Sequence, residues 1–385
     1  MVNMRIIYIV NARIPTEKAY GFQICKTCEK FSDLGIVTEL WYPTRKNAVK
    51  EELFDYYGIK RNFIVKKIKC IDIIFLSKYF GSFVFNVQTI LFLLKILFKK
   101  IPTDTIIYSR DFLVISLLNL KGLKVVYNAH NWSNKRGVFL KLLLNRKIKI
   151  VCNSSGTKNE FYKKGFMNSI SVPNGVDLDK FDKITNDKKD LREKINLPVD
   201  KKLILYLGHL YEWKGFDTVV ESARKTQNNN ILFVVVGGTQ KDIEKYKRII
   251  KDENINNLFF VGHQQQKNTP YYLKSADVLL LPNVATSEES VKFTSPIKMF
   301  EYMASGNPII ASDLPSIKEV LNEKNSVLVE AGNASSLLIG VNRVLEDNNF
   351  AEKIASRAKE DAQKYTWDIY AQKILNFIKF KRCPD

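Results

Sequence analysis

The stretch FTSPIKMFEYMASGNPIIASDLPSIKEV, Phe293–Val320, carries the clearest structural signal in the sequence. Ser295 and Pro296 predict the start of a helix, because a hydroxyl suits the N-cap and a proline suits the first helical position. Gly306 predicts the end of that helix. Between these ends, apolar residues recur at helical spacing and are expected to face a core. They are Ile297, Phe300 and Ala304.

Lys298 is unusual in such a helix, because a cation in the first turn adds to the positive end of the helix dipole. An anionic ligand would remove this conflict, since free backbone N–H groups and a lysine together form a phosphate site. Glu301, one turn further on, could accept hydrogen bonds from two neighbouring hydroxyls, as a ribose offers. Taken alone, the two residues also fit a solvated surface ion pair. Together they favour a site for a nucleoside diphosphate.

Residues 295–315, SPIKMFEYMASGNPIIASDLP, resemble the C-terminal donor motif of retaining GT-B glycosyltransferases of the family 4 (glycosyl transferases group 1) type. The resemblance implies that Glu301 binds the nucleotide ribose. It also implies that the residues before Glu301 approach the diphosphate: Ser295, Pro296 and Lys298. The family pattern has a second glutamate eight positions earlier, which contacts hydroxyls of the donor sugar, whereas this chain has Phe293 there. The resemblance therefore implies a nucleotide site and leaves the sugar open.

Short apolar runs alternate with helical stretches along the chain, a pattern typical of parallel sheets with crossover helices. In the first half the predicted strands are Arg5–Asn11, Val37–Tyr42, Thr105–Ser109, Leu123–Asn128, Lys149–Asn153 and Ile170–Pro173. In the second half they are Leu203–Gly208, Ile231–Val236, Leu258–Val261, Val278–Leu281, Pro308–Ala311 and Val327–Val329. The expected fold class is α/β with two doubly wound parallel sheets. The resemblance implies the GT-B arrangement, two Rossmann-like domains facing across a cleft.

The length of 385 residues suits two domains. We expect an acceptor-side domain over residues 1–176, with its first apolar run a strand and not a signal peptide. A polar, lysine-rich linker follows at 177–200, and the donor-binding domain covers 201–364. The last segment, 365–385, is predicted to form a helix, and the resemblance implies that it crosses back to the first domain.

Residues just after the strands are the first candidates for a site, because open α/β sheets bind ligands beyond the carboxyl ends of their strands. In the first domain Gly21 precedes a predicted helix, and a glycine there lets backbone approach a ligand closely. Arg110 and Asp111 follow one strand and are acceptor-side candidates. His130 follows the next strand; a structural histidine is the alternative, but the resemblance implies a position beside the transferred sugar.

In the second domain the segment LILYLGHLYEWKGFDT, 203–218, places Gly208, His209 and Lys214 between a strand and a helix. A lysine and free N–H groups at that place favour a phosphate site. The family usually has an arginine where this chain has His209, with its lysine five positions later. Because histidine lacks the permanent charge of arginine, Lys214 is expected to carry more of the phosphate interaction.

The formal net charge of +20 comes mostly from lysines spread along the chain. Such a charge fits an anionic membrane surface, an anionic substrate or nucleic acid. No zinc-finger, RRM or similar nucleic-acid motif occurs, so nucleic acid is not an expected partner. The apolar stretch Phe83–Ile101 is interrupted by polar residues and ends in lysines, and does not predict a membrane span. A core helix and an interfacial helix both fit it.

The cysteines are odd in number and scattered, which does not describe a disulfide framework and fits a reducing cytoplasm. They are Cys25, Cys28, Cys70, Cys152 and Cys383. Cys25 and Cys28 form a CxxC pair inside a probable helix and are predicted to be small buried residues there, not metal ligands. Asp177 and Asp179 superficially resemble a metal-binding DxD motif, but the surrounding PNG turn belongs to a different architecture. No metal cofactor is expected.

The resulting hypothesis is a retaining glycosyltransferase that moves a hexose-type sugar from a UDP- or GDP-sugar to a saccharide or lipid-linked saccharide. It would be cytoplasmic or peripheral on the inner face of the membrane, making cell-surface polysaccharide or glycolipid. His130, Lys214 and Glu301 are the catalytic candidates. A sugar-nucleotide epimerase of the same fold and a non-catalytic module that binds nucleotide or nucleic acid are the alternatives.

Overall fold

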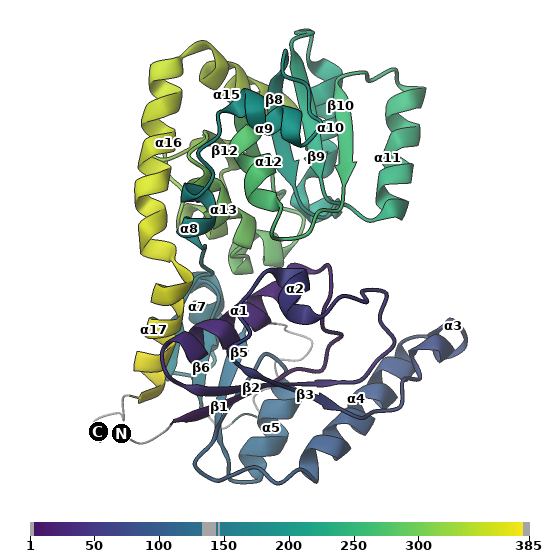
Figure 1. Cartoon of the computed structure of the whole chain (residues 1–385), viewed down its shortest axis with the longest axis vertical. Coiled ribbons are helices and arrows are strands. Elements are labelled where there is room, and N and C mark those ends of the chain that lie inside the picture. The colour runs from purple at the N-terminus through teal and green to yellow at the C-terminus, as the bar shows by residue number, and fades with distance from the viewer. Residues whose placement is uncertain (1–3, 133–143, 145–146, 380–385) are drawn as a thin grey trace. The chain divides into compact units, whose positions relative to one another are not determined.

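The structure is a computed structural model that describes residues 4–132, 144 and 147–379. It divides into two compact units (Figure 1). The first unit comprises residues 1–173 together with the C-terminal segment 367–385, and the second comprises Asn174–Thr366. Each unit is built on its own parallel sheet.

The first unit contains a seven-stranded sheet in the order β3-β2-β1-β4-β5-β6-β7. Figure 1 shows α1 on one face of this sheet and α4 and α5 on the other. Its strands are β1 (Arg5–Ile9), β2 (Val37–Pro43), β3 (Ile64–Ile68), β4 (Ile106–Ser109), β5 (Lys124–Ala129), β6 (Lys149–Cys152) and β7 (Ser169–Ser171). Its helices are α1 (Ala19–Asp33), α2 (Leu53–Tyr57), η1 (Ile74–Leu76), α3 (Ser77–Phe80), α4 (Ser82–Leu97), α5 (Phe112–Leu120), α7 (Ser155–Lys163) and α17 (Trp367–Lys379).

The second unit contains a six-stranded sheet in the order β10-β9-β8-β11-β12-β13. Its strands are β8 (Lys202–Leu207), β9 (Ile231–Val236), β10 (Leu258–Gly262), β11 (Val278–Leu281), β12 (Ile309–Ser312) and β13 (Val327–Val329). The helices that precede β11 are α8 (Leu178–Asp182), α9 (Lys188–Lys194), η2 (Glu212–Lys214), α10 (Phe216–Lys225), α11 (Gln240–Asp252) and α12 (Thr269–Ser275). Those that follow it are η3 (Glu289–Phe293), α13 (Ile297–Ser305), α14 (Pro315–Lys318), α15 (Ala334–Glu346), α16 (Asn348–Ala362) and η4 (Gln363–Tyr365).

The central strand β8 shows why the second unit forms a doubly wound sheet. Successive side chains of a strand point to opposite faces, so an uninterrupted apolar run must be covered on both. Leu203, Leu205 and Leu207 lie in one buried cluster with residues of α12 and α13. Ile204 and Tyr206 lie in another, with residues of α10, α11 and α15. Both faces of β8 are therefore buried, which is what its sequence predicts.

Every strand predicted from the sequence is present, but β3 was missed. Its residues, IVKKI, have lysines in the centre, and Lys66 and Lys67 are exposed. The strand lies at the edge of the described sheet, where it pairs with β2. Edge strands tolerate charged residues, so the apolar run that marks central strands is absent here.

The segment expected to be a linker, 177–200, folds as part of the second unit and contains α8 and α9. Its Arg192 is buried. The guanidinium donates to the backbone oxygens of Ser275 and Lys201, at 2.9 and 3.0 Å, and to Asp277 Oδ2 at 2.7 Å. The N-terminal part of the first unit ends at Pro173.

The C-terminal helix α17 belongs to the first unit and packs on α1. The rings of Trp367 and Phe22 meet edge to face, with centroids 6.1 Å apart. The ammonium of Lys30 lies 2.8 Å from Asp368 Oδ1. The last residues of the predicted helix, 380–385, and Cys383 among them, lie outside the described residues.

Replacing Arg192 by alanine is expected to lower the free energy of unfolding of the second unit by about 3 kcal/mol, because it leaves buried acceptors unpaired. Equilibrium urea unfolding measures this loss. The control is Arg224→Ala, which removes an exposed arginine paired with Glu221 and Glu253 and should cost only about 0.5 kcal/mol. Equal losses in the two variants would show that 188–194 is not anchored as described.

Candidate functional site

The start of α13 differs from the predicted one by one residue. Pro296, not Ser295, occupies the N-cap position, and among the described residues no side chain caps the helix. Ser295 has another role: its Oγ accepts from the backbone N–H of Asn174 at 3.2 Å, and its carbonyl oxygen accepts from Asn174 Nδ2 at 2.6 Å. The predicted cap is wrong because Asn174 takes the hydroxyl. The first turn of α13 is left without a side-chain acceptor.

The rest of α13 agrees with the sequence prediction. Gly306 ends the helix in the left-handed conformation, with φ +73°. Ile297, Phe300 and Ala304 are buried as predicted. The hydroxyl of Tyr302 accepts from the N–H of Leu207 at 3.0 Å and donates to the carbonyl of Leu280 at 3.2 Å, which fixes α13 to the ends of β8 and β11.

Lys298 and Glu301 do not form a surface ion pair, since both are buried, with 8% and 7% of their surface exposed. The ammonium of Lys298 lies over the ring of Tyr206, 4.4 Å from its centroid. It has no hydrogen-bond partner among the described residues. Burial, and secondarily the charge of Lys214, lower the pKa of Lys298 well below its usual value. An amine in this position gains most from an anion.

Lys214 reaches the same place from the loop after β8. A Cβ atom built on Gly208 would lie 3.9 Å from the Nζ of Lys214 and 3.9 Å from the Nζ of Lys298. Burial lowers the pKa of Lys214 to about 8. Its Nζ also lies 5.4 Å from the ring centroids of Tyr211 and Trp213. Two cations therefore converge over one glycine.

The backbone of this loop requires its glycines. Gly208 has φ +133° and Gly215 has φ +72°, and a Cβ on Gly215 would lie 1.7 Å from the carbonyl oxygen of Pro282. A Cβ on Gly237, at the end of β9, would lie 2.4 Å from the carbonyl oxygen of Gly208. Side chains at these positions would push the loop away from the strand ends and move Lys214.

The other predicted residues of the second unit lie around this place. The ring of His209 stacks on Tyr211, with centroids 5.1 Å apart, and its backbone oxygen accepts from the hydroxyl of Tyr206 at 2.7 Å. Glu301 Oε1 accepts a hydrogen bond from Gln266 Nε2. Burial raises the pKa of Glu301 to about 7. Gln266 was not predicted from the sequence.

Phe293, which stands where the family pattern has its first glutamate, ends η3 and is buried. An apolar side chain cannot accept hydrogen bonds from sugar hydroxyls. Among the described residues, no group of three or more His, Cys, Asp or Glu side chains could hold a metal ion.

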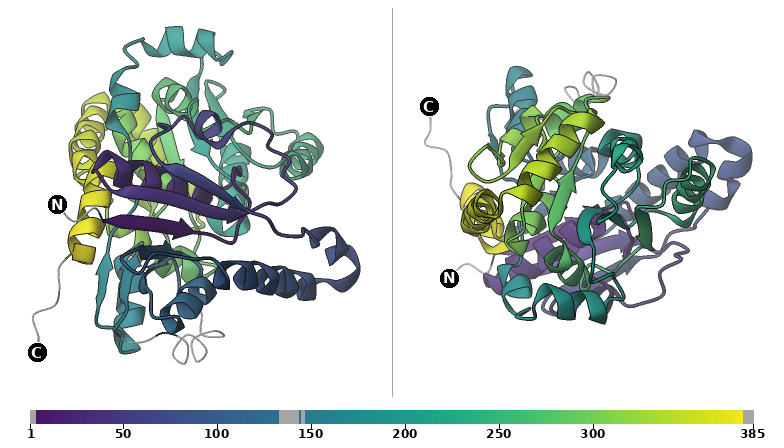
Figure 2. Two further views of the ribbon diagram at one scale, coloured as in Figure 1. Left: turned by 60° about the horizontal axis from the view of Figure 1, so that its bottom comes forward. Right: turned by 90° about the horizontal axis from the view of Figure 1, so that it is seen from above.

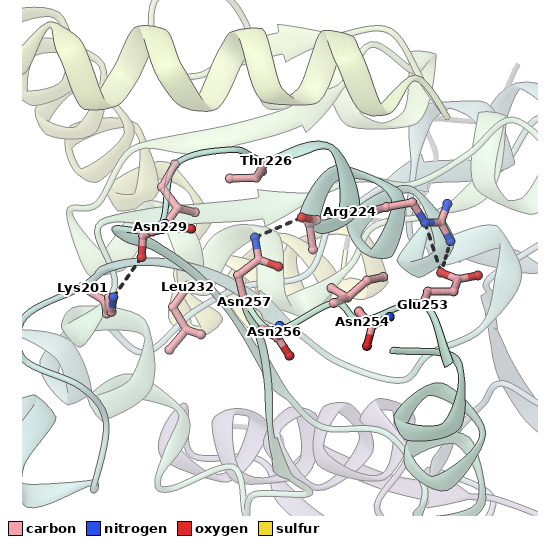
Figure 3. A pocket seen from close by; sticks show the side chains of 12 residues that line it. Lys201, Arg224, Thr226, Asn229, Leu232, Glu253, Asn254, Asn256 and Asn257 are labelled. Atoms are coloured by element: carbon pink, nitrogen blue, oxygen red, sulfur yellow. Dashed lines mark hydrogen bonds and ion pairs between the residues drawn. The ribbon is translucent and has the colours of Figure 1, made fainter. Parts of the chain in front are cut away.

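A separate pocket lies at the amino-terminal ends of strands in the second sheet (Figure 3). It encloses about 410 Å³ and is lined by residues that lie at or just before the starts of β8, β9 and β10 and at the end of α10. Its polar groups bond to one another: Lys201 Nζ donates to the carbonyl of Asn229, and Asn257 Nδ2 to that of Ala223. Lys214 and Lys298 lie at the carboxyl ends of the strands, so this pocket is not part of their site.

In the first unit, His130 follows β5 and is oriented by Asn128. Asn128 Nδ2 donates to the hydroxyl of Tyr108 at 2.7 Å, so its Oδ1 faces His130 Nε2, 2.5 Å away. An oxygen can only accept, so Nε2 of His130 carries the proton. Burial, and then the charge of Arg110, lower the pKa of His130 well below its usual value. His130 is therefore a neutral imidazole whose Nδ1 can accept a hydrogen bond.

The next two candidates of the first unit, Arg110 and Asp111, make contacts within the fold. Asp111 caps α5, since its Oδ1 accepts from the N–H groups of Leu113 and Val114 at 3.0 and 3.4 Å. The guanidinium of Arg110 lies over the ring of Tyr20, 5.2 Å from its centroid, and its Nη1 has no partner among the described residues. Arg110 thus stays available to an anion, whereas the carboxylate of Asp111 is used within the fold.

Gly21 lies in the first turn of α1. The prediction that it precedes the helix is therefore wrong. A Cβ there would lie 2.1 Å from the hydroxyl oxygen of Tyr57 and 2.6 Å from Thr16 Cγ2. The hydroxyl of Tyr57 in turn bonds to the backbone of Thr16. Gly21 is required because the loop after β1 packs closely on Tyr57.

The part of the chain that carries the two lysines matches a known family: residues 187–361 match the model described as glycosyl transferases group 1. The chain is 30% identical over 200 residues to the uncharacterized glycosyltransferase MJ1607 of Methanocaldococcus jannaschii, covering 50% of this chain and 48% of that protein. It is 28% identical over 205 residues to the N,N'-diacetylbacillosaminyl-diphospho-undecaprenol alpha-1,3-N-acetylgalactosaminyltransferase of Campylobacter jejuni, covering 52% and 51%. Each match spans about half the length of the relative.

Among solved structures, Anabaena HepE in complex with UDP-glucose resembles this protein with a TM-score of 0.76 at 17% identity. The alignment covers 97% of this chain and 99% of HepE. At this identity the likeness concerns the fold, and it confirms the predicted GT-B class with its two parallel-sheet units.

NMR titration of the three histidines tests the assignment of His130. We expect the His130 resonances, assigned with His130→Gln, to stay those of a neutral ring across pH 5 to 8. Asn128→Asp places a carboxylate beside the ring and should raise the pKa of His130 by roughly one to three units. A wild-type His130 that titrates near pH 6.5 would contradict the proposed burial and orientation.

Proposed function

Because residues 187–361 match the glycosyl transferases group 1 model, we propose that the protein transfers a hexose-type sugar from a UDP- or GDP-sugar to a saccharide or lipid-linked saccharide. One observation carries the proposal: the amines of the buried Lys298 and the half-buried Lys214 converge over Gly208 beside an uncapped helix N-terminus. This arrangement suits a diphosphate, which brings negative charge to both amines and acceptors to the free N–H groups.

The neighbouring groups fit the rest of a nucleotide. Glu301 lies one turn after Lys298 and is held by Gln266, so its second carboxylate oxygen can accept from the ribose hydroxyls. The ring of Tyr206 beneath Lys298 keeps that amine near the strand ends and away from water. The buried Phe293 takes the place of an acid that would bind sugar hydroxyls, so donor selectivity rests on other contacts.

The proposed chemistry is a retaining transfer. The acceptor hydroxyl oxygen bonds to the anomeric carbon, the bond from that carbon to the β-phosphate oxygen breaks, and the proton passes to the departing phosphate. Lys214 and Lys298 stabilise the charge that grows on the leaving nucleoside diphosphate, which often provides the largest share of catalysis. The neutral His130 would accept a hydrogen bond from a sugar hydroxyl without adding charge.

The proposed acceptor is a saccharide, free or carried by a lipid, used for cell-surface polysaccharide or glycolipid on the inner face of the membrane. The name of the Campylobacter jejuni relative contains a diphospho-undecaprenol-linked sugar, which supports a lipid-linked acceptor. Arg110, whose Nη1 has no partner among the described residues, is the acceptor-side cation.

Nucleoside diphosphates and their sugar conjugates should raise the melting temperature, because a ligand that binds only the folded state stabilises it. A thermal-shift screen with UDP, GDP, ADP and their sugars measures this effect. We expect one base to stabilise the wild type and to lose its effect in Glu301→Ala. The absence of any shift, in a protein that melts cooperatively, would contradict the proposed donor site.

Alanine at Lys214 or Lys298 should reduce kcat by roughly one to three orders of magnitude, because each removes a cation from the leaving group. The control is Lys318→Ala, which removes an exposed lysine paired with Asp313 and should leave turnover unchanged. The assay follows release of nucleoside diphosphate with the donor found in the screen. Full turnover in both site variants would exclude this mechanism.

A further inference from the structure

The connection between β3 and β4 exposes an unusual amount of apolar surface. We define the arm as Ile71–Lys100, which contains η1, α3 and α4. In Figure 2 (left) α3 and the start of α4 extend well beyond the edge of the first sheet. Half of the eighteen large apolar side chains that are exposed in the described chain lie in this arm. They are Ile71, Phe75, Tyr79, Phe80, Phe83, Phe85, Ile90, Leu94 and Phe98.

Helix α4 is apolar on both sides, and only one side is covered. Val84, Gln88, Phe92 and Ile96 recur every four residues and are buried. The opposite face carries Phe83, Ile90 and Leu94, which are exposed. A surface helix normally has a polar outer face, so an apolar one predicts a second contact. The sequence allowed a core helix or an interfacial helix, and α4 has the features of both.

The charged residues of the arm suggest what covers this face. Its lysines, at positions 78, 95, 99 and 100, are all exposed. Its one acid, Asp72, is used within the fold: Oδ2 accepts from the N–H of Lys46 at 2.8 Å, and Oδ1 from that of Ile74 at 3.1 Å. The arm therefore presents lysines and apolar side chains together, without a compensating exposed acid. An anionic bilayer offers both complements, acyl chains and negative headgroups.

The arm is also held in shape. The buried amide of Gln88 accepts from the N–H of Ile73 at 2.9 Å and donates to the carbonyl of Ile71 at 2.7 Å, which ties the start of the arm to α4. The apolar face is thus ordered before any contact forms. No described helix is long and apolar enough to cross a membrane.

We propose that the arm is a membrane-binding surface that inserts Phe80, Phe83 and their apolar neighbours into an anionic leaflet while its lysines contact the headgroups. A second copy of the chain fits less well, because pairing two arms would bring their lysines together. The role of this surface, which is to bring the enzyme to a lipid-linked acceptor, rests on the proposed function.

Sedimentation with vesicles of phosphatidylglycerol and phosphatidylcholine tests the surface without any substrate. The wild type should bind the anionic vesicles, and Phe80→Ser with Phe83→Ser should bind about tenfold or more weakly. Lys99→Gln and Lys100→Gln should each weaken binding by roughly fivefold, with less effect as salt is raised. The matched control is Phe259→Ser, which changes an exposed phenylalanine of β10 and should bind like the wild type.

Two readouts separate this proposal from its alternatives. Nucleotide-induced thermal shifts should be equal in the wild type and the arm variants, so loss of vesicle binding is not confused with failure of the donor site. Sedimentation velocity should show monomers at micromolar concentration. Equal vesicle binding by wild type and arm variants, no binding by the wild type, or a dimer that the arm variants abolish would each overturn the proposal.

Discussion

The strongest constraint on the second unit is the convergence of two lysine side chains, the buried Lys298 and the half-buried Lys214, which no acid pairs in the part of the chain that the structure describes. Lys214 lies in the loop after β8 and Lys298 in the first turn of α13, and the charge of Lys214 adds to burial in lowering the pKa of Lys298. Burial disfavours the charged form of an amine, so the pKa values of both lysines are lowered in the free protein. Hydrogen bonds within the fold hold the two lysines in place. Tyr302 joins α13, which carries Lys298, to β8 and β11. The N–H of Val284 donates to the carbonyl of Trp213, next to Lys214, at 3.1 Å.

Burial also lowers the pKa of a basic side chain, His130, at the carboxyl ends of the strands of the first sheet. His130 is kept neutral by burial and by Arg110, and Asn128 fixes which nitrogen carries its proton. Tyr108, which holds Asn128, is itself part of the core. Both units thus present polar groups at the carboxyl ends of strands that are buried from their second residue onward. The strand ends are the natural place for them, because there the backbone leaves the sheet and side chains need not pack against the next strand.

What the sequence predicts well is local. Apolar runs located all the strands except β3, whose lysines are allowed by its edge position. Gly306 ended α13 as expected. The errors came from partners distant in sequence: Asn174 takes the hydroxyl of Ser295, and Tyr57 rather than a ligand explains Gly21. Gln266 could not be found from a motif, because nothing local indicates that its amide meets Glu301. Each lysine was assigned to a phosphate from its own surroundings in the sequence, but their convergence over Gly208 depends on the fold.

Isothermal titration calorimetry of nucleoside diphosphate binding at pH 9, in buffers of different ionisation enthalpy, tests the central claim most directly. The folded-state pKa of Lys214 is about 8 in the free protein, so at pH 9 its amine is mostly uncharged, and that of Lys298 also has a lowered pKa. A bound diphosphate favours the charged forms and raises both pKa values. Binding at pH 9 should therefore take up protons, and fewer in Lys214→Met than in the wild type. Binding without any proton uptake at pH 9 would contradict the claim that these two lysines hold the diphosphate.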